Sequence, residues 1–160
     1  MSASDCWSTQ RNILAVEGLR CGGRLRLHVR GASMLPTLFP GDVAEIEACS
    51  LEVVAPGEIV LAFREDRFFL HRFMSRNGTH HFVARGDSMP GADPAYTTEE
   101  LVGRLAAATR EGQPVSLPAR PWTRALGLLF CYSSIARRIA LRLHHSRNFQ
   151  RLPGADLEIA

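Results

Sequence analysis

Apolar and polar residues alternate strictly over residues 24–30, with leucine or valine at every second position and basic side chains between them. This pattern predicts a strand with one buried face. The following stretch, 31–41, contains two glycines and two prolines, and these prolines exclude a regular helix across it. Apolar runs at 43–46 and 58–64 predict two further strands.

Two apolar and aromatic runs, 67–75 and 79–85, are separated by an Arg-Asn-Gly turn, which predicts a β-hairpin. A loop with two glycines and two prolines follows at 86–97. Residues 99–108 fit either a helix or a strand, because the internal Gly103 weakens both interpretations.

These elements divide the chain into three parts. Residues 1–23 form an N-terminal extension of mixed composition that ends in a Cys-Gly-Gly turn signal. Residues 24–112 form a β-rich domain. Residues 113–160 form a proline-containing connector and a basic amphipathic helix over 122–145. We therefore expect a mainly β fold, a small coiled sheet of barrel-like form with a C-terminal helix.

Composition constrains the chemistry. With 46% hydrophobic and 22% charged residues, the chain has the composition of a globular domain. All 19 residues counted as lysine or arginine are arginines, because the sequence contains no lysine. A mechanism that depends on a neutral lysine amine is therefore excluded.

Cysteine spacing and hydropathy indicate the cellular setting. The four cysteines are scattered, with no Cys-x-x-Cys pair and no His/Cys cluster at zinc-ligand spacing. We expect free thiols in a reducing compartment and neither a metal nor another cofactor. The N-terminus lacks the order of a secretion signal, and no run approaches the roughly 20 apolar residues that span a bilayer. These features predict a cytoplasmic protein.

A candidate nucleophile lies in the turn-rich stretch. Ser33 follows the first predicted strand in a turn of small residues and proline, where backbone N–H groups could stabilise an oxyanion. Serines are common in turns, so this feature alone does not predict catalysis. His71 lies among aromatic and aliphatic neighbours, where a buried structural histidine is the ordinary interpretation. Asp87 and Asp93 lie in the long loop, where each could instead be a turn residue.

Three motifs in order resemble those of the type I signal peptidases and the related LexA-like self-cleaving repressors. GASMLPTLFPGD, which contains Ser33, is similar to the nucleophile box of the family. GEIVLAFREDRFFLHRF carries His71 where the family's base lies, and ARGDSMPGAD is similar to its acidic box and contains Asp87 and Asp93. A trailing LVGRL resembles the strand that closes the catalytic domain. The resemblance covers roughly residues 27–106.

The missing lysine decides which branch of the family the chain resembles. Most bacterial members use lysine as the base, whereas archaeal and endoplasmic-reticulum signal peptidases use histidine. Histidine side chains, with an ordinary pKa of about 6.5, are largely neutral at pH 7 and can accept a serine proton. The resemblance implies Asp93 as the principal acid, which would orient the imidazole of His71, and Asp87 as the second aspartate of the site. Gly31 stands where many signal peptidases have a serine, so the oxyanion would rely on backbone N–H groups.

The resemblance implies a serine endopeptidase that processes a leader or signal segment of a protein or peptide precursor. Two alternatives remain open. One is a LexA-like self-cleaving regulator, for which Cys21-Gly22 is the candidate bond. The other is a catalytically inactive module that binds a peptide as an added strand. No nucleic-acid partner is expected, and the basic helix over 122–145 either packs on the β domain or contacts a membrane surface peripherally.

Overall fold

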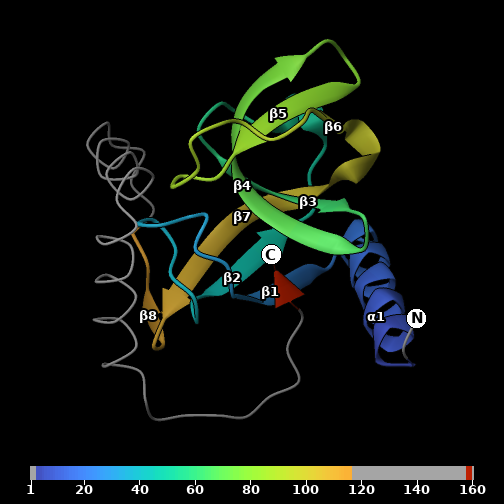
Figure 1. Ribbon diagram of the computed structural model, residues 1–160, viewed down its shortest axis with the longest axis vertical. Helices are drawn as coiled ribbons and strands as arrows, with labels where there is room; N and C mark the ends of the chain where they lie inside the picture. Colours follow the sequence, from blue (N-terminus) through green and yellow to red (C-terminus); the bar gives the residue numbers. More distant parts are fainter. Residues whose placement is uncertain (1–2, 117–157, 160) are drawn as a thin grey trace.

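The computed structural model describes residues 3–116 and 158–159 (Figure 1). Within these residues, one helix of 18 residues, α1 (Ala3–Arg20), accompanies a single nine-stranded sheet. The mainly β fold that the sequence predicts is confirmed. The strands are β1 (Arg24–Val29), β2 (Val43–Glu47), β3 (Ile59–Arg64), β4 (Arg67–Asn77), β5 (His81–Arg85), β6 (Tyr96–Thr97), β7 (Leu101–Arg110), β8 (Gln113–Pro114) and β9 (Glu158–Ile159), with 3₁₀ helices η1 (Leu51–Val53) and η2 (Thr98–Glu100).

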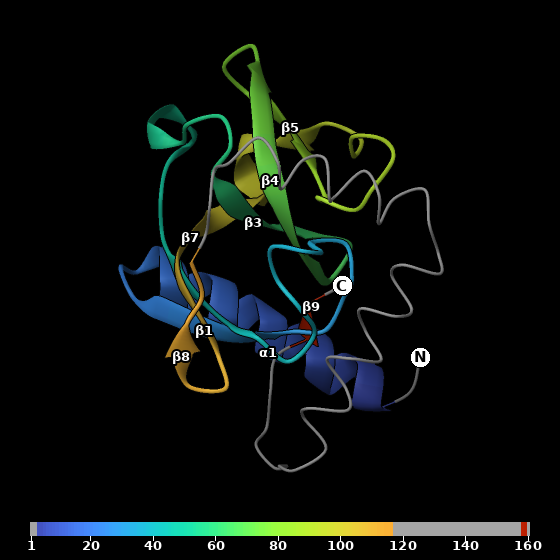
Figure 2. The same ribbon diagram turned by 90° about the vertical axis from the view of Figure 1, so that its left-hand side faces the viewer.

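The antiparallel pairings run in the order β1-β2-β7-β3-β4-β5-β6, with β8 paired to β7. These antiparallel pairings end at β1 and at β6, so they do not close into a ring. The sheet is therefore not the closed barrel that a barrel-like form would suggest. The short strand β9 pairs in parallel with both β1 and β4 and lies between them. Figure 2 shows the β4–β5 hairpin rising well above the level of β1.

Tight turns connect β3 to β4 and β4 to β5, so these three strands form two successive hairpins. The β3–β4 connection consists of Glu65 and Asp66, whose φ angles of 51° and 61° are those of a type I′ turn. In the β4–β5 hairpin, Asn77 pairs with His81, and Gly78 has a φ of 71°. The hairpin predicted from the Asn-Gly signal is confirmed.

Residues 99–108, which fit either a helix or a strand in the sequence, begin in η2 and continue as β7. Gly103 has a packing reason. A Cβ atom at this position would lie 2.3 Å from the carbonyl oxygen of Glu47 in β2. Only glycine therefore lets β7 approach the β2 backbone this closely.

The sequence pattern does not predict helix α1, since it indicates only an extension over residues 1–23. Within residues 10–20, for which burial is described, the buried positions are Asn12, Val16 and Leu19, which lie on one helical face. The polar Asn12 is buried, where its amide nitrogen donates to the backbone carbonyl of Asp66 at 3.0 Å, whereas Leu14 is 62% exposed. The apolar positions therefore do not follow a helical period, which is why the pattern gave no signal.

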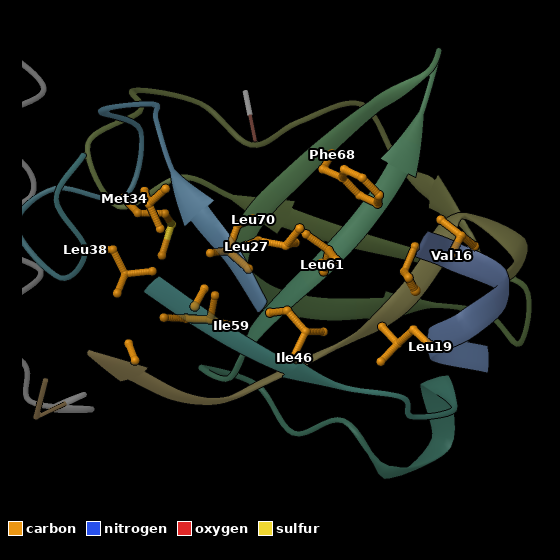
Figure 3. Close-up of a cluster of buried hydrophobic side chains, with 14 residues drawn as sticks. Val16, Leu19, Leu27, Met34, Leu38, Ile46, Ile59, Leu61, Phe68 and Leu70 are labelled. Atoms are coloured by element: carbon orange, nitrogen blue, oxygen red, sulfur yellow. The ribbon is translucent and has the colours of Figure 1, made fainter. Parts of the chain in front are cut away.

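Two clusters of buried apolar side chains lie on opposite faces of β3. Ile59 and Leu61 belong to the larger cluster, and Val60 and Ala62 belong to the smaller. Figure 3 shows the larger cluster, which also contains Leu19 of α1. Because α1 contributes to this core, it is part of the folded domain.

Among the described residues, no helix is both long enough and apolar enough to cross a membrane. The basic helix predicted over 122–145 lies outside the described residues, as does most of the predicted connector. Residues 113–114 of that connector form β8.

Candidate active site

Ser33 lies in the loop that joins β1 to β2 (residues 30–42, the nucleophile loop), and its side chain is partly buried. Met34 and Leu38 of this loop are fully buried in the larger core cluster. The backbone N–H of Leu38 donates to the carbonyl of Met34 at 3.0 Å. The buried side chains of Met34 and Leu38 therefore hold in place the part of the loop that carries Ser33.

The aspartate of the Gly-Asp pair in the first motif, Asp42, stabilises the nucleophile loop. Asp42 is fully buried and accepts a hydrogen bond from the backbone N–H of Phe39 at 2.8 Å. Arg110 of β7 donates to both carboxylate oxygens of Asp42, at 2.7 and 2.8 Å. The guanidinium of Arg110 also lies 4.5 Å from the centre of the Phe39 ring. Asp42 therefore holds the shape of the nucleophile loop.

The structure brings Ser33, His71 and Asp93 together in one line of hydrogen bonds. The Nε2 atom of His71 lies 3.1 Å from Oγ of Ser33, and its Nδ1 lies 2.5 Å from Oδ2 of Asp93. The side chain of His71 is only 7% exposed and that of Asp93 is 16% exposed. An ionised carboxylate can only accept a hydrogen bond, so Nδ1 carries the hydrogen and donates it to Asp93, and Nε2 is left as the acceptor that faces the serine hydroxyl.

The position of Asp93 is fixed by its neighbours. Its backbone N–H donates to the carbonyl of Ala84 in β5 at 2.9 Å. The hydroxyl of Tyr96 donates to Oδ2 of Asp93 at 3.0 Å. Burial, and next the negative charge of Asp93, raise the pKa of the Tyr96 phenol well above its usual range. Tyr96 therefore remains a hydrogen-bond donor to Asp93.

The hydrogen bonds of Asp87 go to Arg72 and Thr37, whereas Asp93 is the aspartate that bonds to His71. The two oxygens of Asp87 each accept a hydrogen bond from Arg72 at 2.7 Å, and Oδ2 accepts another from the hydroxyl of Thr37 at 2.5 Å. Arg72 follows His71 on β4, and Thr37 belongs to the nucleophile loop. Asp87 therefore ties the loop that carries Ser33 to the strand that carries His71.

Ser88 holds the backbone around the nucleophile. This residue is 2% exposed, and its N–H donates to the carbonyl of Ser33 at 2.8 Å. Its hydroxyl lies 2.7 Å from the carbonyl oxygen of Ala32 and 3.0 Å from that of Ser33. The Ala32 carbonyl and the Ser33 N–H belong to one planar peptide group. Ser88 therefore fixes the direction of the Ser33 N–H.

Gly86 shows how closely the acidic loop packs on the nucleophile. A Cβ atom at this position would lie 2.8 Å from the carbonyl oxygen of Ser33 and 3.0 Å from its Cβ. Glycine is therefore required there by contact with Ser33. Neither Gly86, Ser88 nor Tyr96 was singled out from the sequence. Gly86 and Ser88 lie inside the third motif, whereas nothing in the sequence marks Tyr96.

Two histidines and two cysteines of the described residues are not among the hydrogen-bond partners of Ser33, His71 or Asp93. His80 and His81 are exposed. Cys21 and Cys49 are free thiols, and burial raises the pKa of Cys49 to about 11. In the part of the chain that the structure describes, no His, Cys, Asp and Glu side chains gather in a group that could hold a metal ion. An open hollow of about 560 Å³ is lined by residues that include Arg20 and Cys49, but not by Ser33, His71 or Asp93.

Comparison with protein-family models finds no match, and neither does comparison with curated protein sequences. The function is therefore argued below from the contacts of Ser33, His71 and Asp93 and from the motifs that carry them.

Proposed function

We propose that the chain is a serine endopeptidase of the signal-peptidase type, with Ser33 as nucleophile, His71 as base and Asp93 as the residue that orients the base. One observation carries the proposal. The two ring nitrogens of a nearly buried histidine are divided between a partly buried serine hydroxyl, at 3.1 Å, and a carboxylate, at 2.5 Å. This is the arrangement that activates a serine for attack on a carbonyl carbon.

In the first step, Nε2 of His71 accepts the proton of the Ser33 hydroxyl while Oγ attacks the scissile carbonyl carbon. The imidazolium that forms is stabilised by the carboxylate of Asp93 at Nδ1. The same imidazolium then protonates the leaving amine, and an acyl-serine remains. In the second step, His71 accepts a proton from water, which attacks the acyl carbon. The imidazolium then returns this proton to Oγ of Ser33 as the acyl–oxygen bond breaks and the acid product leaves.

The oxyanion of each tetrahedral intermediate needs hydrogen-bond donors. Gly31 offers no side chain, so backbone N–H groups of the nucleophile loop, chiefly that of Ser33, supply them. Ser88 supports this role because it holds the Ala32 carbonyl of the same peptide group at 2.7 Å. A donor whose direction is fixed before the reaction needs no free energy of reorientation when negative charge develops on the oxyanion.

The substrate class follows from the motif resemblance. A protein or peptide precursor with a leader or signal segment is the proposed substrate, cut after a small residue. Cytoplasmic location and peripheral membrane contact are parts of the same proposal.

The first test measures both labelling and cleavage. Purified protein should react with a small fluorophosphonate and should cut members of a proteome-derived peptide library, with sites read by mass spectrometry. Ser33→Ala should abolish both without lowering the melting temperature by more than about 2 °C, because a partly exposed hydroxyl adds little to stability. Cleavage by Ser33→Ala at the wild-type rate would refute the proposal.

A peptide-binding module without activity is the second candidate, and one observation favours it. Strand β9 is a peptide segment paired on both sides within the sheet. Such a module would bind extended peptides but would leave the fluorophosphonate unreacted. The LexA-like alternative predicts that the intact chain cuts itself at Cys21-Gly22, which lies between α1 and β1, only 12 positions before Ser33.

A further inference from the structure

The strands that lead to Ser33 and His71 both pair with β9. β1 pairs with β2 along one edge and with β9 along the other. β4 pairs with β3 along one edge, and its pairing with β5 begins only at Arg72. Before that point its other edge pairs with β9, at Phe68. A position one strand wide, the β1–β4 slot, therefore lies between β1 and residues 67–71, and β9 occupies it. Figures 1 and 2 both show β9 beside β1.

Strand direction connects this slot to the candidate active site. Glu158 pairs with His28, and Ile159 pairs with both Val29 and Phe68, in parallel on each side. Ser33 follows Val29 by four residues, and His71 follows Phe68 by three. A peptide that lies in the slot in the direction of β9 therefore runs with its C-terminal end toward the nucleophile and the base.

The chemistry of the slot suits an extended peptide. Its two edges present backbone N–H and C=O groups, which bind any extended segment through main-chain hydrogen bonds. Pairing on both sides satisfies the backbone groups of the inserted segment, as in the middle of a sheet. A substrate in this direction presents the residues before the scissile bond to the slot, and its scissile carbonyl reaches Ser33.

We propose that Glu158–Ile159 occupies the strand position that a peptide substrate must take, so that the chain competes with substrate for its own active site. This inference rests on the proposed function, because occupancy regulates cleavage only if Ser33 cleaves peptides. A tethered segment acts at an effective concentration in the millimolar range. A slot that is open about one tenth to one half of the time weakens the apparent affinity for substrate about two- to tenfold.

The first arm of the test does not depend on activity. The double variant Glu158→Pro, Ile159→Pro removes both backbone N–H groups of β9, whereas Glu158→Ala, Ile159→Ala keeps them. Amide hydrogen exchange is measured on peptides that cover residues 24–29 and 67–71. We expect faster exchange in both segments of the proline variant and wild-type exchange in the alanine variant. Exchange in the proline variant equal to that of the wild type would overturn the inference. Protection that rises with protein concentration would also overturn it, since it would show binding between chains.

The second arm measures access to Ser33. Acylation rates are compared for a small fluorophosphonate, which does not need the slot, and for a tri-alanyl peptide fluorophosphonate, which does. The proline variant should react about two- to tenfold faster than the wild type with the peptidyl probe and at an unchanged rate with the small one. Equal acceleration by both probes would overturn the inference. Faster amide exchange without labelling of Ser33 by either probe would keep the occupied slot and refute the proposed peptidase instead.

Discussion

The two aspartates of the acidic loop do different work, although they lie six positions apart. Asp93 shares a hydrogen bond with Nδ1 of His71. Asp87 accepts from Arg72 and Thr37 and is 14% exposed, as is Arg72. Removing the charge of Asp93 changes the hydrogen bond that orients the base, His71. Removing the charge of Asp87 weakens the contact between the nucleophile loop and β4. The two residues therefore separate a catalytic effect from a structural one.

Asp93→Asn should reduce single-turnover cleavage by roughly 10² to 10⁴, because the amide can hold the imidazole of His71 in the wrong tautomer. Asp87→Asn should reduce turnover less and should lower the thermal midpoint more, because Arg72 loses a charged partner. Single-turnover rates and melting curves of both variants check this. A severe catalytic loss in Asp87→Asn with a mild one in Asp93→Asn would show that Asp87, and not Asp93, orients His71.

Protonation of Tyr96 makes the free energy of unfolding depend on pH in the alkaline range. The pKa of Tyr96 in the fold is raised by burial and by the charge of Asp93. Free tyrosine has a pKa of about 10. Above that pH the unfolded chain releases the phenol proton while the folded chain keeps it, so the stabilisation from this group is present below pH 10 and is lost as pH rises.

Tyr96→Phe should therefore be less stable than the wild type by about 1 kcal/mol at pH 8, where it lacks the hydrogen bond to Asp93. This difference should shrink between pH 10 and pH 11.5. Urea midpoints across this range measure it. The partly buried thiol of Cys49, whose pKa is raised to about 11, titrates in both proteins alike, so its contribution cancels in the difference. A difference that stays constant or widens with pH would contradict the assignment.

The resemblance of three ordered motifs to a known family implied Ser33, His71 and Asp93 as one group, and the structure brings these three side chains together. Tyr96 could not be predicted in this way. Its hydroxyl bonds to Asp93, three positions earlier in the chain, and the residue is placed in β6 by pairing with Phe82 of β5, which is a property of the folded sheet. Ser88 was likewise missed as a contact of Ser33, since 55 residues separate them in the chain.

Local pattern determined most strands, and long-range contact determined the remaining elements. The strict alternation in β1 and the Asn-Gly turn before β5 are local signals, and both were interpreted correctly. Gly103 looked like a weakness in any element until the backbone of Glu47 was found 2.3 Å from the position of its absent Cβ. Helix α1 was missed because Asn12 is buried through a contact with Asp66, 54 residues away.

The β3–β4 turn offers a test of one element. Asp66 has a φ of 61°, which favours glycine in a type I′ turn, and its backbone carbonyl bond to Asn12 does not depend on its side chain. Asp66→Gly should raise the free energy of unfolding by up to about 1 kcal/mol. Asp66→Ala, which keeps a Cβ atom at positive φ, should lower it. Urea unfolding measures both, and equal destabilisation by the two changes would argue against a type I′ turn.

Helix α1 and the sheet share one core, so the whole described domain should unfold together. Leu19 is 2% exposed in the larger cluster, beside residues of β1, β3 and β4, whereas Leu14 on the same helix is 62% exposed. These two leucines form a matched pair, with the same side chain removed from the core or from the surface of one helix.

Leu19→Ala should lower the free energy of unfolding by about 2–5 kcal/mol, a large share of the 5–15 kcal/mol that holds a typical domain together. Leu14→Ala should change it by no more than about 0.5 kcal/mol. Urea titrations followed by circular dichroism at 222 nm, which reports helix, and at 217 nm, which also reports strand, should give coincident transitions for every protein. Loss of the helix signal at lower urea in Leu19→Ala, with the strand transition unmoved, would show that α1 is a separate extension. Coincident transitions shifted together would instead place α1 in the same cooperative unit as the strands that carry Ser33 and His71.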